Sequence, residues 1–226
     1  MPQVPFLSFP LSSIRRSIKD IDDSYRNPWD LFAELSQNAV DAIKKMQQSS
    51  QEKGKISIVV DSRAKKIVFE DNGCGIPGSQ LPTLLNLFSS GKAGDPNSVG
   101  EKGVGLKFVM FQSAFFEIIT SDGNSTSKVT ITDARLWKKS SSDQQLLMDF
   151  EENITPNNPH GTKITVSDIE IDRDDEEEQT TSLFNLSFDQ LKFLLRNKTY
   201  LGFVSSIWSE NPNPIDIALE YIDFNG

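Results

Sequence analysis

A glycine-rich turn, Asp71-Asn-Gly-Cys-Gly-Ile-Pro77, constrains the fold more than any other stretch of this sequence. It follows residues 66–70, whose β-branched and aromatic side chains predict a strand. Two glycines separated by one residue allow a sharp backbone turn and the close approach of a ligand. An aspartate at the mouth of such a turn can accept a hydrogen bond from a buried amine. The alternative interpretation is an ordinary exposed turn at a strand end.

A long amphipathic helix is predicted over residues 29–48, and Pro28 suits its first turn. Its apolar stripe consists of Phe32, Leu35, Ala39, Ala42, Ile43 and Met46. Glu34, Asn38 and Asp41 stand at i, i+4 and i+7, so they form a polar stripe beside the apolar one. This border position predicts side chains that look into a cleft, and a plain solvated face is the alternative.

The remaining periodic segments predict an α+β fold. The expected elements are helices over 11–25, 81–88 and 188–197, a hairpin of strands over 55–61 and 66–71, and strands over 115–121, 128–132, 146–150 and 162–166. Short polar turns are expected between the later strands. This order predicts a mostly antiparallel sheet with helices on one face, a two-layer α/β sandwich.

Residues 89–102 are rich in small and polar side chains and can bury little surface. Such a segment predicts a mobile lid over a ligand, or alternatively a plain surface loop. It leads into Gly100-x-x-Gly103-x-Gly105, where the apolar residues from Val104 onward predict the beginning of a helix. A glycine-rich turn that opens a helix offers free backbone N–H groups to an anion, although a flexible hinge is the alternative.

Composition narrows the partners and the setting. The formal net charge of −9 argues against direct nucleic-acid binding by this part of the protein, because binding of the phosphate backbone needs clustered Lys and Arg. A single cysteine excludes an internal disulfide and favours a reducing, cytoplasmic location. No apolar run approaches the roughly 18 residues of a membrane helix, so no membrane partner is expected.

The end of the sequence predicts a domain boundary. Residues 1–210 are expected to form one domain, because Asn211-Pro-Asn-Pro is a plain break in the pattern. Residues 215–224 alternate like a new strand, so 211–226 are expected to be a linker and the first strand of a following domain.

Three motifs taken together resemble those of the GHKL superfamily, which includes gyrase, the heat-shock-90 chaperone, sensor histidine kinases and MutL. They are Glu34-Leu-Ser-Gln-Asn38-Ala-Val-Asp41-Ala, Asp71-Asn-Gly-Cys-Gly75 and Gly100-x-x-Gly103-x-Gly105. Their order and spacing fit, and Gly161-Thr162-Lys163 resembles the fourth motif, a threonine on a late strand. The resemblance implies the Bergerat fold, with ATP between helices and sheet under a mobile lid at 89–102.

The resemblance also implies a role for each matching residue. Asp71 would receive the adenine amino group, Gly75 would let the base sit close, and Thr162 would support the contact through its hydroxyl or a water. Asn38 would coordinate Mg²⁺, and Glu34 would be the general base that deprotonates the attacking water. The implied nucleotide contacts are Asn38, Asp71, Gly73, Gly75, Asn86, Lys92, Gly100, Gly103, Val104, Gly105 and Thr162.

The form of the first and third motifs is most similar to the chaperone, MutL and MORC branch. That branch implies an ATP-hydrolysing module of a larger machine, an ATP-dependent homodimer, and a following domain or partner subunit that completes the site. The alternative is a nucleotide-sensing or kinase-type module, which binds ATP without hydrolysing it with water. The presence of Glu34 favours the ATPase. The only histidine, His160, lies in a turn beside Pro159, which does not fit a phosphoacceptor on a dimerisation helix.

Overall fold

The computed structural model describes residues 10–86, 104–154, 159–170, 183–204 and 214–224. Its helices are α1 (Leu11–Ser24), α2 (Asp30–Gln47), α3 (Leu81–Leu85), α4 (Gly105–Phe111), α5 (Ala134–Lys139), α6 (Phe188–Lys198) and α7 (Leu201–Val204). Short 3₁₀ turns occupy Gly78–Gln80 and Leu183–Asn185. Its strands are β1 (Lys55–Asp61), β2 (Lys66–Asp71), β3 (Ser113–Ser121), β4 (Thr126–Thr132), β5 (Asp149–Glu151), β6 (Gly161–Ile169) and β7 (Asp216–Ile222).

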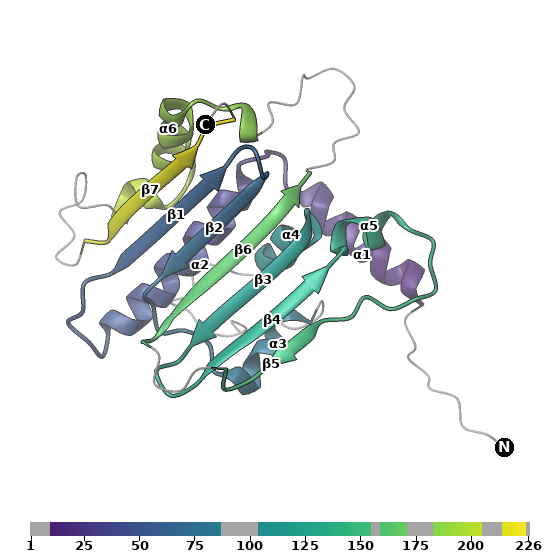
Figure 1. The fold of residues 1–226 in the computed structure, drawn as a ribbon, viewed down its shortest axis with the longest axis horizontal. Helices are drawn as coiled ribbons and strands as arrows, with labels where there is room; N and C mark the ends of the chain where they lie inside the picture. Colours follow the sequence, from purple (N-terminus) through teal and green to yellow (C-terminus); the bar gives the residue numbers. More distant parts are fainter. Residues whose placement is uncertain (1–9, 87–103, 155–158, 171–182, 205–213, 225–226) are drawn as a thin grey trace.

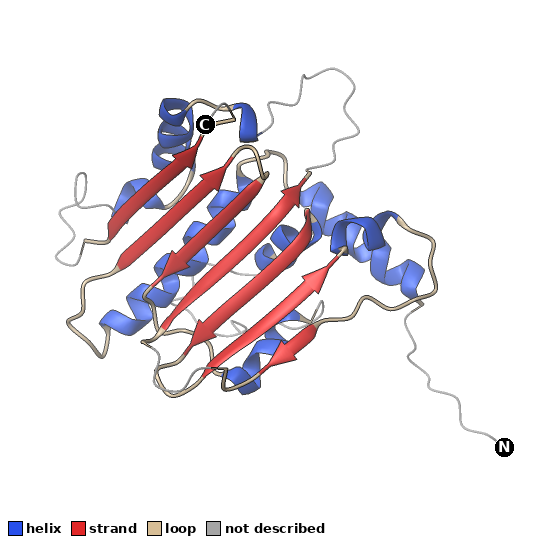
Figure 2. Cartoon of the chain, viewed as in Figure 1, coloured by secondary structure: helices blue, strands red, loops and turns tan. Residues whose placement is uncertain are grey.

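The strands of the described part form one seven-stranded sheet in the order β5-β4-β3-β6-β2-β1-β7. Neighbouring strands in this sheet are antiparallel, apart from β1 and β7, which are parallel. Figures 1 and 2 show the helices behind one face of this sheet, which leaves the other face open. The predicted α+β two-layer architecture is therefore confirmed.

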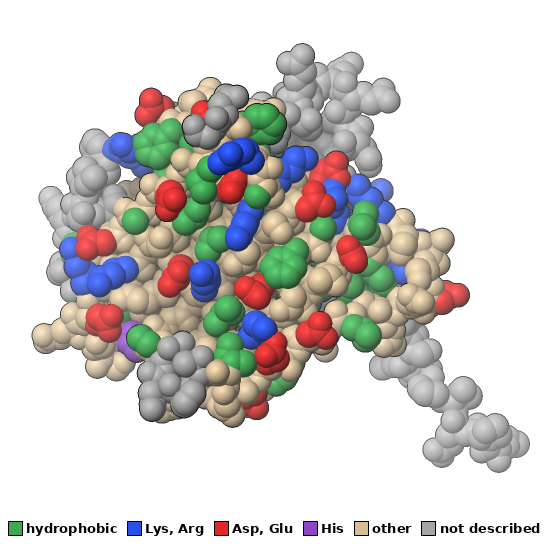
Figure 3. Space-filling model, in the orientation of Figure 1, with side chains coloured by type: hydrophobic (Ala, Val, Ile, Leu, Met, Phe, Trp, Pro, Cys, Tyr) green, Lys and Arg blue, Asp and Glu red, His purple; other side chains and the backbone are tan. Residues whose placement is uncertain are grey.

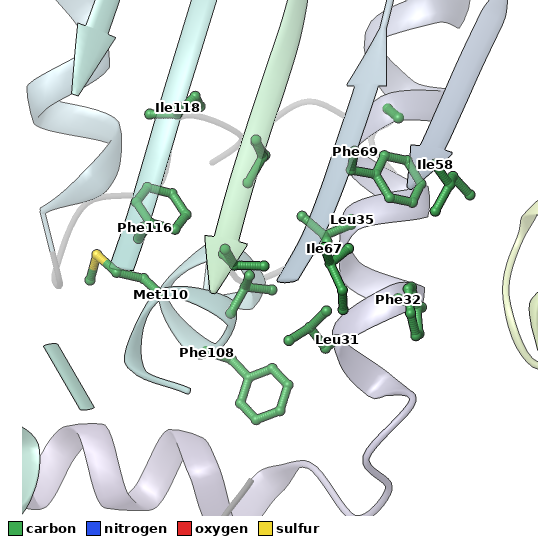
Figure 4. Packing of buried hydrophobic residues seen from close by; sticks show 14 of the residues in the cluster. Leu31, Phe32, Leu35, Ile58, Ile67, Phe69, Phe108, Met110, Phe116 and Ile118 are labelled. Atoms are coloured by element: carbon green, nitrogen blue, oxygen red, sulfur yellow. The ribbon is translucent and has the colours of Figure 1, made fainter. Parts of the chain in front are cut away.

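Alternation along the strands decides which face the helices cover. Ile58 of β1 and both Ile67 and Phe69 of β2 are buried, while their neighbours along each strand are more exposed. Their side chains point into the space between the sheet and α2, toward Phe32 and Leu35 (Figure 4). The predicted apolar stripe of α2 therefore covers the predicted hairpin.

The region around α5 differs from the sequence-based expectation, which placed only polar turns between β4 and the next strand. α5 has six residues, too few to show an apolar period, and tertiary contacts hold it against α1. The Arg15 guanidinium lies 4.4 Å from the centroid of the Trp137 ring, and Asp22 forms an ion pair of 2.5 Å with Lys138. The strand expected over 146–150 also begins later, at Asp149.

β7 lies beyond the domain boundary expected at residue 210. The predicted strand forms, but it pairs in parallel with β1, with Ile217 opposite Ile56 and Leu219 opposite Ile58. The first residue of β7 is hydrogen-bonded to the residue before β1, because the Asp216 N–H donates to the Gly54 carbonyl at 2.9 Å. An otherwise free edge of β1 offers a row of backbone donors and acceptors that a following strand can complete. β7 therefore belongs to this sheet.

The open face of the sheet carries both signs of charge. Figure 3 shows Lys and Arg side chains interspersed with Asp and Glu across this face. Within the described ranges, no helix is both long enough and apolar enough to cross a membrane.

Candidate functional site

The first predicted site residues lie on α2, which packs against β2. Glu34 and Asn38 are one helical turn apart, and both are half-buried at the border of the packed face. The predicted polar stripe therefore does lie beside the buried stripe, facing the space between α2 and the neighbouring elements.

The glycine turn after β2 rests directly on α2. The Cys74 N–H donates to the Ala42 carbonyl at 3.0 Å. A Cβ on Gly73 would come within 2.5 Å of the Ala42 Cβ, so the approach requires a glycine. Ala42 was expected in the apolar core, but it is only half-buried, and the glycine turn packs against it. Gly73 thus allows the motif to reach the helix that carries Glu34 and Asn38.

Gly75 is needed for a second close contact. Its φ of +64° lies in the left-handed region, and a Cβ would overlap the carbonyl oxygen of Ser121 at the end of β3. The Ile76 N–H then donates to Thr120 Oγ1 at 2.9 Å. The turn is therefore clamped between α2 and β3, which gives Gly75 a structural role independent of any ligand.

Asp71, Thr162 and Thr120 stand in one row across β2, β6 and β3. Asp71 is in register with Thr162, which is in register with Thr120. The two threonine hydroxyls are 3.0 Å apart, and Thr162 is only 8% exposed. Sequence reasoning missed Thr120, although it continues the inward-facing series of Phe116 and Ile118 as a polar residue. The row brings a carboxylate and two hydroxyls together under the helices.

The Asp71 carboxylate is poorly solvated. Burial raises its pKa to about 7, while the Gly73 N–H, which donates to Oδ1 at 2.8 Å, acts in the opposite direction. Nearby Glu70 raises the pKa further and His160 lowers it. A buried carboxylate of this kind gains from a ligand that donates a hydrogen bond to it.

This burial predicts a pH-dependent stability. Between about pH 4 and pH 7 the folded chain keeps a proton on Asp71 that the unfolded chain has released, because the ordinary pKa is 3.8. The free energy of unfolding should therefore fall as the pH rises through this range, by on the order of 2–4 kcal/mol from this group. Asp71→Asn should remove that contribution. Urea unfolding of both proteins at several pH values would measure it, and parallel pH profiles would contradict the assignment.

His160 fastens the other side of the turn. With its proton on Nδ1, the ring donates to the Gly73 carbonyl at 2.8 Å and the Asn72 carbonyl at 3.0 Å. Its Nε2 lies 3.2 Å from Glu52 Oε2, and Asn72 Nδ2 donates to the other oxygen of Glu52 at 2.9 Å. The histidine noted in the sequence therefore has a structural role at the motif.

The beginning of α4 meets the Glu34 side chain. Gly105 is the first residue of α4, and a Cβ there would overlap the Glu34 carboxylate oxygen Oε2. The other oxygen, Oε1, accepts a hydrogen bond from the Tyr25 hydroxyl at 2.9 Å. Residues of the first and third predicted motifs, which are far apart in the sequence, are thus in contact. Tyr25 had no sequence signal, because it lies in the break between two helices.

The remaining predicted residues are less informative. Val104 directly precedes α4. Asn86 follows α3 and is exposed. Lys92, Gly100 and Gly103, together with the predicted lid at 89–102, lie outside the described residues.

Two hollows on the described surface differ in chemistry from the residues around Asp71 and Glu34. One is almost wholly apolar and lies between α6 and the residue before α2, with Trp29, Phe193 and Leu194 in its wall. The other crosses the strand ends from the open face, where Lys163 and Glu70 join residues of the Asp71 row. The buried carboxylate, the hydroxyl row and the Glu34–Gly105 contact all face α2 or α4, so we place the candidate site on the helical side.

The oxygen ligands of this site fit a nucleotide that binds together with its own metal ion. No group of three His, Cys, Asp or Glu side chains gathers as a metal site among the described residues. Mg²⁺ commonly takes only one or two protein oxygens and completes its octahedron with phosphates and waters. The Asn38 amide oxygen is a suitable single ligand of that kind. At the other end, the Asp71 row suits a planar group that carries an amine.

The chain also matches a known protein family. A family model described as histidine kinase-, DNA gyrase B-, and HSP90-like ATPase matches residues 25–168. The matched range contains α2, the glycine turn, the beginning of α4 and most of β6. A search of curated proteins found no match.

Proposed function

Because the chain belongs to the histidine kinase-, DNA gyrase B- and HSP90-like ATPases, we propose that it is the ATP-hydrolysing module of a larger assembly. Membership of this family implies ATP binding. The observation that carries the step from binding to hydrolysis is the contact between the Glu34 carboxylate and Gly105 at the start of α4. A carboxylate beside a glycine that opens a helix is well placed to act on a water near a bound phosphate.

The adenine end of the site would lie at the Asp71 row. The Asp71 carboxylate would accept a hydrogen bond from the exocyclic amine, which replaces the solvation that burial removes. Thr162 would support this contact directly or through a water, and Thr120 holds the Thr162 hydroxyl in place. Gly73 and Gly75 keep the turn close to α2 and β3, so the carboxylate position is rigid.

The phosphate end would lie between α2 and α4. Val104 and Gly105 would offer backbone N–H groups to phosphate oxygens, as glycine-rich helix beginnings do. Asn86 would approach from the end of α3, and Lys92, Gly100 and Gly103 would complete the contacts. Asn38 would hold Mg²⁺, which neutralises phosphate charge when it is bound.

Hydrolysis requires one proton transfer and one displacement. The water oxygen forms a bond to the γ-phosphorus, and the bond from that phosphorus to the β–γ bridging oxygen breaks, with its electron pair leaving on ADP. Glu34 orients the water and takes its proton, and the protonated carboxyl later releases that proton to solvent. The products are ADP and inorganic phosphate. We further propose that ATP favours a homodimer, which sedimentation with a non-hydrolysable analogue would test.

Asn38→Ala tests the metal part of the proposal. We expect the parent chain to bind ATP more tightly with Mg²⁺ than with a chelator, and the variant to lose this difference, because its amide oxygen is gone. Calorimetry in both buffers measures the effect. Gln37→Ala, one residue away on α2, is the matched control and should retain the difference.

The same calorimetry, combined with phosphate release, tests the function itself. Binding of ATP with release of phosphate supports the ATPase. Binding without any phosphate release would replace it with a nucleotide-sensing module, and no binding at all would exclude both.

A further inference from the structure

Tyr25 lies at the junction of α1, α2 and α4. It follows α1 with an extended backbone, at φ −99° and ψ 126°, and its N–H donates to the Asp22 carbonyl at 3.1 Å. The next two N–H groups, of Arg26 and Asn27, donate to Asp30 Oδ2 at 3.0 Å and 2.9 Å. The connection between α1 and α2 is therefore tied to the first turn of α2, which limits where Tyr25 can go.

The ring of Tyr25 is held by stacking. Its centroid lies 3.9 Å from that of Phe108, with 15° between the ring planes. Phe108 belongs to α4 and is only 2% exposed, and Figure 4 shows its ring extending from α4 toward Leu31 at the beginning of α2. A ring packed flat on a buried partner has little freedom to swing, so the direction of its hydroxyl is set by α4.

The hydroxyl reaches one oxygen of Glu34, and the other oxygen faces a different element. Tyr25 donates to Oε1 at 2.9 Å, while Oε2 lies against Gly105. Glu34 on a helix could otherwise adopt several rotamers. Contacts at both oxygens leave the carboxylate one orientation, with Oε2 at the beginning of α4.

The environment also determines the form in which Tyr25 acts. Burial, and then the neighbouring charge and hydrogen bond of Glu34, raise the pKa of the phenol far above its ordinary value, with Asp30 adding to the effect. The phenol is therefore a neutral O–H donor throughout the physiological pH range. A donor of this kind stabilises the ionised carboxylate, which is the form that a general base needs.

We propose that Tyr25 is a positioning residue for the hydrolytic step, which holds the Glu34 carboxylate in a single orientation through the stacked pair with Phe108. This inference rests on the proposed function, because it assigns Glu34 as the base. It also links α1 and α4 to the reaction, since a movement of either helix shifts the donor. Tyr25 itself touches neither substrate nor water in this assignment.

The test compares Tyr25→Phe with the parent chain in steady-state ATP hydrolysis and in ATP calorimetry. The phenylalanine keeps the stacked ring and removes only the hydroxyl. We expect kcat to fall about tenfold, because a mis-set catalytic group loses rate steeply, while KM and the Kd for Mg·ATP stay within roughly twofold. Tyr221→Phe is the matched control. Tyr221 lies on β7, away from the motifs, and its hydroxyl donates to the Leu186 carbonyl at 2.6 Å. The kcat of this variant should equal that of the parent.

Phe108→Leu is the second variant, because it keeps the hydroxyl but removes the surface on which the Tyr25 ring is stacked. It should lower kcat with the same unchanged Kd. A kcat within twofold of the parent in Tyr25→Phe would overturn the inference, and so would an equal loss in kcat and in ATP affinity, which indicates a merely structural role. Should Tyr25→Phe fail to fold, a parental kcat in Phe108→Leu would overturn it instead.

Glu34→Ala separates this inference from the function on which it rests. An inactive Glu34→Ala alongside a fully active Tyr25→Phe rejects the role of Tyr25 alone. A Glu34→Ala that hydrolyses ATP at the parental rate rejects the proposed function, and the inference fails with it.

Discussion

Glu34→Ala should retain ATP and lose its hydrolysis. A general base typically contributes about 10²–10⁴-fold to the rate, and its removal leaves ground-state binding largely unchanged. The Glu34 carboxylate is held between the Tyr25 hydroxyl and Gly105, so alanine deletes the proposed proton acceptor and leaves the backbone of both neighbours in place. The variant should therefore accumulate in the ATP-bound form, and as a dimer if nucleotide drives association.

Single-turnover phosphate release and ATP calorimetry on the same preparations measure the two parts of this result. Glu117→Ala is a suitable control, because Glu117 is a half-buried glutamate of β3 that lies next in sequence to the inward-facing Phe116 and Ile118 and so points to the opposite face. It should hydrolyse ATP at the parental rate. Parental hydrolysis by Glu34→Ala would refute the assignment of the base and favour a nucleotide-sensing or kinase-type role.

Asp71→Asn should bind ATP roughly 10- to 100-fold more weakly while it keeps its fold. A hydrogen bond to a charged group contributes about 1.5–3 kcal/mol, and asparagine replaces the charged acceptor with an amide. The amide oxygen can still accept the Gly73 N–H, so the turn that rests on α2 should survive. The amide nitrogen, in contrast, would face the amine of the proposed adenine as a second donor.

Calorimetry with ATP and with adenosine, together with circular dichroism, gives the measurement. Both ligands should lose affinity by a similar factor, because the change affects the base and not the phosphates. Asp61→Asn is the control, since Asp61 accepts the Arg63 and Ala64 N–H groups at the opposite end of the same hairpin. Equal ATP affinity in Asp71→Asn and in the parent would remove Asp71 from the adenine contact.

The two variants together locate the chemistry. Loss of turnover with intact binding at Glu34, and loss of binding at Asp71, would place the two ends of the nucleotide along α2. The opposite pattern, with binding lost at Glu34 and turnover lost at Asp71, would reverse the orientation of the ligand.

Local patterns determined much of the fold. The alternation of Ile56, Ile58 and Val60 matches the period of a strand, and the apolar stripe of α2 matches that of a helix, so both elements and their buried faces follow from neighbouring residues alone. Gly73 and Gly75 predicted a turn, because glycine allows both a sharp bend and a close approach of the backbone to other elements. The order of the three motifs was sufficient to indicate the family, which the match over residues 25–168 confirms.

Other features depended on contacts between residues far apart in the sequence. β7 completes the free edge of β1, whereas its own alternation was equally compatible with another sheet. Ala42 contacts the glycine turn because Gly73 approaches it closely, and no local sequence pattern predicts that approach. α5 is a helix because Trp137 and Lys138 meet α1.

The same division holds within the candidate site. Its motif residues could be named from the sequence because chemistry and spacing restrict them to Glu, Asn, Asp and Gly. Thr120 and Tyr25 could not, since a threonine in a strand and a tyrosine in a helix break are common. Their contacts arise only when β3 and β6 align two hydroxyls 3.0 Å apart, and when α4 stacks Phe108 under the Tyr25 ring. A sequence thus determines which groups are available, and tertiary packing decides which of them meet, because hydrogen bonds and ring contacts act only over a few ångströms.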